Sequence, residues 1–224
     1  MVTTKTSPAE GEGRRQRRRE QTKEKLFLAA MQLFARKGYP GTTVEEITQA
    51  ADVGKGTFFN YFPSKDHVLS YLIERQIGVL ERHLLLAREG NATNADVLMS
   101  LARELIRLPS SSPHMARAII SAFLGNAEVR ERMVREFERG RTMIAEIIEL
   151  ETKRGKLRGK MNSSELARVF QRALMGTVLL WALDPAEPIE EQFQNTMRVF
   201  VSGVGAKPES RPAPGRKKAP REAR

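Results

Sequence analysis

A long amphipathic segment followed by two short ones, near the start of the chain, constrains the fold more than any other feature. Apolar residues recur at helical spacing between Arg17 and Lys37, and Gly38 ends that pattern. The next segment opens with the spacing of a capping box, Thr43 and Glu46, in which each side chain bonds a free backbone N–H of the other residue. A long helix followed by two short helices joined by a turn predicts a helix-turn-helix unit.

The rest of the chain also has the periodicity of α-helices, and its sequence contains no pair of strands and no fixed-period repeat. We therefore predict an all-α protein of about nine helices. After the first two helices, the expected ones occupy residues 55–61, 64–90, 96–108, a segment ending at 125, 128–152, 163–181 and 188–203. The expected parts are a disordered basic arm (1–16), a three-helix helix-turn-helix domain (17–65), a larger helical domain (66–204) and a disordered basic tail (205–224).

The composition excludes several classes of protein. The chain has no cysteine, so disulfides, thiolate metal sites and cysteine nucleophiles are excluded. His67, His83 and His114 lie too far apart in sequence for a metal motif, and no Walker or dinucleotide-binding fingerprint occurs. The N-terminus lacks the apolar core of a signal peptide, and no apolar run approaches the roughly 18 residues that cross a bilayer. We expect a cytoplasmic protein that needs no metal or cofactor, catalyses no reaction and does not enter a membrane.

The positive charge gathers at the two ends of the chain. The formal net charge is +11, and residues 207–224 carry seven Lys and Arg against two Glu. Near the N-terminus, Arg14, Arg15, Arg17, Arg18 and Arg19 directly precede the first apolar stripe. This pattern favours an end of the molecule that faces a polyanion. The arginine run either enters a DNA minor groove or adds salt-dependent attraction to phosphates, and a solvated helix start is the alternative.

Residues 51–66, ADVGKGTFFNYFPSKD, place glycines, lysines and aromatic rings side by side. Because Gly54 and Gly56 lack side chains, the start of this helix can approach a phosphate closely, and Lys55 adds a positive charge there. Phe58 is expected to turn inward onto the first helix. An aromatic-rich core turn is the alternative for this stretch alone. In a helix-turn-helix unit, however, the second helix enters the DNA major groove, which accounts for the whole pattern.

The same residues resemble the signature of the TetR family of bacterial transcriptional regulators. That signature reads close to IA-x-x-AGVS-K-G-T-(L/F)-Y-x-YF-x-(S/N)-K-(E/D)-x-L. This chain has ITQAADVGKGTFFNYFPSKDHVL from Ile47 to Leu69. The upstream run LFARKGYPGTTVEEI agrees as well, so the detailed resemblance covers about residues 20–72. Beyond these residues the chain matches the family in length and in its all-helical pattern.

The resemblance implies a DNA-binding role for the residues that match the signature and for the start of the helix before it. These residues are Thr43, Lys55, Gly56, Thr57, Phe59, Asn60, Tyr61 and Lys65. Lys65 is implied to contact a phosphate, and Asn60 occupies a variable position that reads sequence. Two departures concern the turn and the aromatic pair: Asp52 and Gly54 replace the usual glycine and serine, and Phe59 replaces the common tyrosine. Aspartate tolerates a left-handed turn and glycine is an acceptable cap, so we expect the turn to form.

The resemblance also implies a dimer interface on the last two helices and an effector pocket among the middle ones. The candidates for the interface are Phe170, Leu174, Val178, Trp181, Phe193, Met197 and Phe200. The candidates for the pocket are Met99, Arg103, Met115, Phe123, Met133, Phe137, Arg141 and Met175, in which the two arginines suit an anionic head group. The alternative for both sets is packing or exposure within a single protomer.

These features together predict a dimeric repressor that binds a palindromic operator in double-stranded DNA, works on the nucleoid, and is released by a small-molecule effector. Two rival hypotheses remain at this level. One is an architectural or nucleoid-associated DNA-binding protein without an effector. The other is a cationic helical protein that acts at membrane surfaces through its tails.

Overall fold

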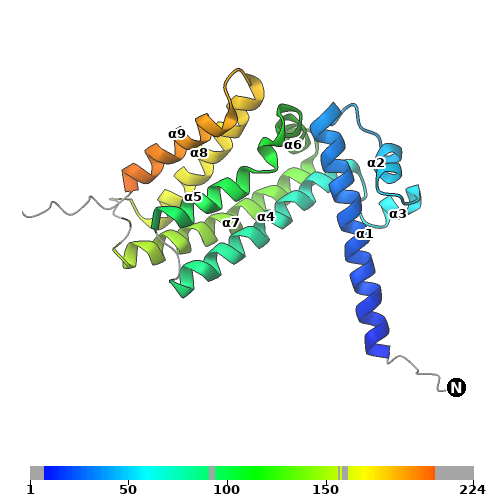
Figure 1. Cartoon of the computed structure of the whole chain (residues 1–224), viewed down its shortest axis with the longest axis horizontal. Helices are drawn as coiled ribbons and strands as arrows, with labels where there is room; N and C mark the ends of the chain where they lie inside the picture. Colours follow the sequence, from blue (N-terminus) through cyan, green and yellow to red (C-terminus); the bar gives the residue numbers. More distant parts are fainter. Residues whose placement is uncertain (1–7, 91–93, 156, 158–160, 205–224) are drawn as a thin grey trace, which may run out of the picture.

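The computed structural model describes residues 8–90, 94–155, 157 and 161–204 of the 224-residue chain. Within these residues the structure is built from α-helices (Figure 1). The elements are α1 (Pro8–Lys37), α2 (Val44–Ala50), α3 (Lys55–Phe59), α4 (Lys65–Glu89), α5 (Asn94–Ile106), the 3-10 turn η1 (Pro109–Ser111), α6 (Pro113–Gly125), α7 (Ala127–Lys153), α8 (Ser163–Leu183) and α9 (Ile189–Val204). The prediction of an all-α fold with an N-terminal helix-turn-helix unit is confirmed.

The molecule has a small head and a larger body that share one long helix. α1, α2 and α3 form the head at one end, and α4 runs from the head along the length of the body (Figure 1). In the body, α7 packs along α4 on one side and along α8 on the other, and α9 packs on α8. α6 contacts both α1 and α8, so it joins the head to the body.

Local interactions of the kind read from the sequence shape the head. Thr43 caps α2 through the expected capping box with Glu46. Asp52 adopts the left-handed conformation, with φ of 54°, and it makes the turn between α2 and α3. Gly54 is the N-cap of α3 and provides no side-chain cap. The α3 helix ends at Phe59, two residues before the predicted end, so Asn60 and Tyr61 follow the helix.

The beginning of α1 corrects one expectation. Residues 1–16 were predicted to be a disordered arm, but α1 begins at Pro8 rather than at Arg17 and spans 30 residues. Proline is well suited to the first turn of a helix, where its missing N–H has no partner to lose. The packed part of α1 supplies the helix nucleus, and each further residue then needs only propagation, which is far easier than nucleation. The predictions for residues 1–7 and for the tail 205–224 lie outside the described residues.

Two large clusters and one small cluster of buried apolar side chains hold the described elements together, and α4 contributes to both large ones. The first cluster joins α1, α2 and α3 to the first part of α4, to α6 and to the start of α7. The second joins the remainder of α4 to α5, α7, α8 and α9. Along α4 the change falls between Ile73, in the first cluster, and Ile77, in the second. Gly140 permits the close packing of α7 on α4, since a Cβ there would lie 2.9 Å from Leu80 Cδ1.

Candidate DNA-binding head and ligand cavity

The recognition-helix segment presents its predicted contact residues on the outside of the head. Lys55, Gly56, Phe59 and Asn60 are exposed. Thr57 and Tyr61, the other two predicted residues of this segment, are half-buried. Phe59 keeps 49% of its surface exposed.

Phe58 anchors this segment from the inside. Its side chain is fully buried, as predicted, and its ring packs edge-on against that of Phe59, with centroids 5.4 Å apart. Internal packing does not require the two glycines: a Cβ at Gly54 or Gly56 would meet no atom within 4 Å. Because no side chains project from these two positions, a DNA backbone can approach the outer surface of α3 closely.

The N-terminus of α2 is tied to the neighbouring helices by ion pairs. Lys37, at the end of α1, donates to the Glu46 carboxylate, and this bond together with the Thr43 backbone N–H lowers the pKa of Glu46 to about 2. Lys55 donates to Glu45, which lowers the pKa of that carboxyl group. Lys55 is thus exposed and lies beside Glu45, in the first turn of α2.

Lys65 is directed into the head rather than outward. Its Nζ donates hydrogen bonds to the carbonyl oxygens of Tyr39, at 2.9 Å, and Thr42, at 3.1 Å, and lies 4.2 Å from the centroid of the Tyr39 ring. The Tyr39 hydroxyl donates to the Asp66 carboxylate, and burial together with this bond raises the pKa of Tyr39. The first turn of α4 thereby holds the loop before Thr43 in place. The sequence analysis missed Tyr39 and Asp66, and phosphate contact by Lys65 stays a prediction.

The head is joined to the body through α6 and α7. Ser112 donates to the carbonyl oxygen of Ala35 in α1 at 2.8 Å. Met115 and Met133, both predicted to line a pocket, are buried in the first cluster, where they pack with the head. Neither of them lines the cavity described below, so their role as pocket residues stays a prediction.

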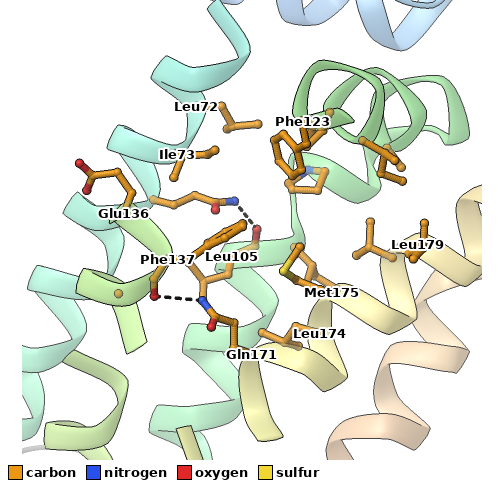
Figure 2. A pocket seen from close by; sticks show the side chains of 18 of the residues that line it. Leu72, Ile73, Leu105, Phe123, Glu136, Phe137, Gln171, Leu174, Met175 and Leu179 are labelled. Carbon is orange, nitrogen blue, oxygen red and sulfur yellow. Dashed lines mark hydrogen bonds between the residues drawn. The ribbon is translucent and has the colours of Figure 1, made fainter. Parts of the chain in front are cut away.

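The body has a partly open cavity of about 310 Å³ between α4, α5, η1, α6, α7 and α8 (Figure 2). Its wall is almost entirely apolar. The lining residues are Leu72, Ile73, Gln76, Ile77, Leu80, Leu105, Ile106, Pro109, Ala116, Ile119, Ile120, Phe123, Leu124, Glu136, Phe137, Gly140, Ile144, Phe170, Gln171, Leu174, Met175, Gly176, Val178 and Leu179.

Three polar side chains belong to this wall. Gln76 donates to the Leu105 carbonyl at 2.8 Å, and Gln171 donates to the Phe137 carbonyl at 3.2 Å. Glu136 turns its carboxylate away from the other lining side chains, and its Oε2 lies 3.8 Å from Arg139 (Figure 2). The cavity therefore offers a ligand an apolar surface with two amide groups that are already hydrogen-bonded.

Three of the eight predicted pocket residues, Phe123, Phe137 and Met175, line this cavity. Met99 and Arg103 instead line a separate surface hollow between α5 and α9. Arg141 lies 3.7 Å from Glu138 and is not part of the wall. Neither arginine lines this cavity, so contact of Arg103 and Arg141 with an anionic head group stays a prediction.

The predicted dimer residues also need correction. Phe170, Leu174, Trp181, Phe193, Met197 and Phe200 are all buried inside the protomer, where α8 packs against α9 and the body, and Val178 is half-buried and lines the cavity. The apolar side chains that α8 and α9 expose are different ones: Val169, Met175, Leu179, Leu180, Leu183 and Val199. Helix α8 is thus apolar on two faces, and the sequence alone did not say which face is internal.

Because α8 carries apolar side chains on two faces, its mean hydropathy is high. Among the described residues, it is the one helix whose length and mean hydropathy, 1.3, satisfy the criteria of a membrane span. The sequence analysis did not anticipate this. Core helices of soluble proteins satisfy the same criteria, and Phe170, Leu174 and Trp181 are packed inside the protein.

Known proteins resemble the head most closely. The sequence model of bacterial regulatory proteins of the tetR family matches residues 22–72. The regulator TcmR of Streptomyces glaucescens is 42% identical over 66 residues, which are 30% of this chain and 29% of TcmR. A regulator encoded in the lacX 3' region of Lactococcus lactis is 39% identical over 64 residues, 29% of this chain and 33% of the relative. The matched segment thus spans about a third of the length of these relatives.

Solved structures resemble the whole chain. A TetR-family regulator from Mesorhizobium loti has a TM-score of 0.62 at 20% identity, covering 84% of this chain and 99% of its own. The TetR-family repressor FadR of Thermus thermophilus, solved with lauroyl-CoA, is 30% identical, with a TM-score of 0.57 over 86% of this chain and 99% of its own. The match of the head, the helical body and the identity over nearly all of FadR lead to one conclusion: this chain belongs to the TetR family of bacterial regulatory proteins.

Proposed function

We propose that this protein is a homodimeric repressor that binds a palindromic DNA operator through its head and is released when a small apolar molecule occupies the cavity. The observation that supports this most strongly is the sharing of α4. Leu72 and Ile73 belong to the buried cluster of the head and also line the cavity. A ligand that displaces these side chains acts directly on the packing that orients α1, α2 and α3.

The same wall links the cavity to α6 and α7. Phe123 and Phe137 line the cavity, contact each other edge-on with centroids 6.2 Å apart, and pack against the head's cluster. In a dimer, the two recognition helices must match half-sites about 34 Å apart, so a small rotation of α4 weakens binding at both half-sites together. A ligand that binds the rotated state more tightly shifts the population toward it.

Two half-sites require two heads, and the exposed side of α8 provides the surface for a second copy. Leu180 and Leu183 are 65% and 68% exposed, and Val199 on α9 is 73% exposed. Large side chains of this kind, gathered on helices that already pack their other face internally, mark an interaction surface. One short recognition helix contacts too few base pairs for useful specificity, which favours pairing of two protomers.

The cavity favours a ligand with an apolar portion. Among the described residues, none that lines it is a lysine, arginine or histidine, and burial of a charge without a partner is costly. Its volume lies at the lower end of the roughly 300–1,000 Å³ typical of ligand pockets. The relative FadR was solved with lauroyl-CoA, so an acyl chain is a reasonable first probe for this cavity. The polar end of such a ligand would remain outside the apolar wall.

The decisive experiment is selection of bound DNA from a random pool at physiological salt, followed by release assays. We expect the selected DNA to contain a palindromic site. We expect the protein to bind such sites on the nucleoid in the cytoplasm and to catalyse no reaction. Lauroyl-CoA should release that site and free CoA should not. Met175→Trp, which fills the cavity from α8, should keep operator binding and lose the release. Equal affinity for random and selected DNA would instead support an architectural protein, and binding to anionic vesicles without DNA binding would support a membrane-surface role.

A further inference from the structure

The arginine-rich start of α1 extends beyond the part of this helix that packs in the head (Figure 1). Side chains 13–21 are all exposed, and they include Arg15, Arg17, Arg18 and Arg19. Figure 1 shows that α2 and α3 lie beside the C-terminal half of α1, while the N-terminal half continues well past them. We call residues 13–21 the arginine helix. The repressor function proposed above does not by itself explain this segment.

The helical state of this segment decides between the two DNA contacts open to it. An α-helix with its side chains is about 10–12 Å wide, whereas the minor groove of B-DNA is about 6 Å wide. A helix of this width does not enter the groove as an extended arm does. Its arginines therefore reach the phosphates that border a groove, and such contacts raise affinity without reading sequence.

The spacing of these arginines along α1 places some of them on the face of the helix that packs inside the head. Arg15 and Arg19 are four residues apart and continue, through Thr22, the stripe formed by Leu26 and Leu33, which are buried in the head's cluster. Arg18 lies on the same face, three residues after Arg15. The side of α1 that packs inside the head thus becomes, about two to three turns earlier, a basic surface that points the same way.

We infer that the arginine helix contacts the phosphates of DNA that flanks the operator, outside the half-site bound by α3. This inference rests on the proposed dimer. In Figure 1 the arginine helix points away from the side on which α8 and α9 lie. If two protomers meet through α8 and α9, their arginine helices point outward, away from the two-fold axis. The operator complex then extends beyond both half-sites, by contacts that depend on salt and not on base sequence.

Repulsion among the arginines of this helix favours their contact with DNA phosphates. Arg15 and Arg18, and Arg15 and Arg19, are close neighbours on one face and repel each other in the free protein. Phosphates relieve this repulsion, and the counterions that they release make affinity fall with salt. Each neutralised phosphate contributes about 0.9 to the slope of log K against log salt, so three arginines in each of two protomers contribute up to about 5.

The test compares two DNA fragments and two triple variants of the full-length protein. One fragment ends at the edges of the selected operator, and the other adds flanks of arbitrary sequence on both sides. The test variant is R15Q/R18Q/R19Q. The control, R107Q/R135Q/K153Q, removes the same charge from exposed positions of the body outside α8 and α9. The wild type and the control should bind the flanked fragment at least tenfold more tightly, with a steeper salt slope, and the test variant should bind both fragments alike.

A second variant tests the helical geometry without changing the charge. Gln21→Pro places a helix-breaking residue at the end of the arginine helix, before the packed part of α1 and at an exposed position. We expect it to keep the affinity for the short operator and to lose most of the flank effect. An unchanged flank effect in Gln21→Pro would overturn the helical contact in favour of an extended arm.

The other outcomes are equally decisive. A wild type that binds both fragments alike, or a control variant that loses the flank effect as fully as the test variant, would overturn the inference. So would binding of wild-type protein, but not of the test variant, to vesicles of anionic phospholipid while the flank effect is absent. Failure of the proposed function looks different, because no specific site is then selected and the short operator is not bound by any variant.

Discussion

Gln76 in α4 donates a hydrogen bond to the backbone carbonyl of Leu105 in α5, across 2.8 Å at the wall of the cavity. Leu105 lies in the last turn of α5, and the residue four positions later is Pro109, which has no N–H to offer. The glutamine therefore satisfies a carbonyl that the helix itself leaves open. It also ties the helix that links head and cavity to a neighbouring helix of the body.

The first prediction follows from this bond. Gln76→Leu should lower the free energy of unfolding by about 1–3 kcal/mol, the cost of leaving a buried acceptor without a partner. Gln171→Leu is the matched control, since its acceptor, the Phe137 carbonyl, lies within α7 and has an amide partner in its own helix. Urea unfolding of both variants measures the difference. Equal losses would mean that the Leu105 carbonyl finds another donor.

The second prediction separates the two lysines of the head. Lys65→Met should destabilise the protein by about 1.5–3 kcal/mol, because the ammonium group bonds two backbone carbonyls that hold the loop before α2. Lys55→Met should leave the melting temperature nearly unchanged, since its exposed ion pair with Glu45 contributes little, and should weaken DNA binding. Thermal unfolding and operator titration of both variants check this. If Lys65→Met has the stability of the wild type, the structural role of Lys65 is contradicted and the predicted phosphate contact is favoured.

The third prediction concerns acid. The bond from Lys37 and the Thr43 N–H lower the pKa of Glu46 from 4.5 to about 2, so the ionised carboxylate favours the folded state. This contribution is present above about pH 4.5 and is lost as the pH falls toward 2. Glu46→Gln keeps a capping-box side chain and lacks the ionisation. Stability measured between pH 5 and pH 2.5, about the range in which the two pKa values differ, should fall more steeply for wild type than for this variant. Parallel curves would show that Glu46 titrates alike in both states.

The fourth prediction tests the dimer surface. L180E/L183E should produce a monomer with an intact helical spectrum, because both side chains are exposed in the protomer and their replacement leaves its core in place. L85E/L86E changes two leucines of similar character on α4, which are 56% and 46% exposed, and should remain dimeric. Light scattering gives the masses, and operator binding should fall only for the α8 variant. A dimeric α8 variant would place the interface elsewhere.

The accuracy of the sequence predictions followed the range of the interactions involved. The capping box at Thr43, the turn at Asp52 and the inward direction of Phe58 depend on neighbours within a few residues, and the structure has all three. The start of α1 was misplaced because glycines and like charges favour disorder locally, whereas the helix propagates from packed residues further along. The packed residues that nucleate the helix lie further along the chain than the local sequence pattern around residues 8–16.

The cavity and the dimer surface depend on which face of each body helix turns inward. Met115 and Met133 have the composition of pocket residues, but they pack against the head. Phe170 and Phe200 have the composition of interface residues, yet their rings contact each other inside the protomer, 5.4 Å apart. Because α8 is apolar on both faces, only the placement of its neighbours decides between them. That information lies in contacts between distant segments, which periodicity does not encode.

The change of cluster along α4, between Ile73 and Ile77, falls where the family resemblance of the sequence model also stops, at residue 72. A body with a different ligand can therefore be joined to the same head within one turn of a single helix. The graft would have to preserve the few body residues that pack into the head, such as Met115 and Met133. We therefore expect a chimera spliced at Gln76 that keeps those contacts to bind the DNA site of the original head and to respond to the ligand of the new body.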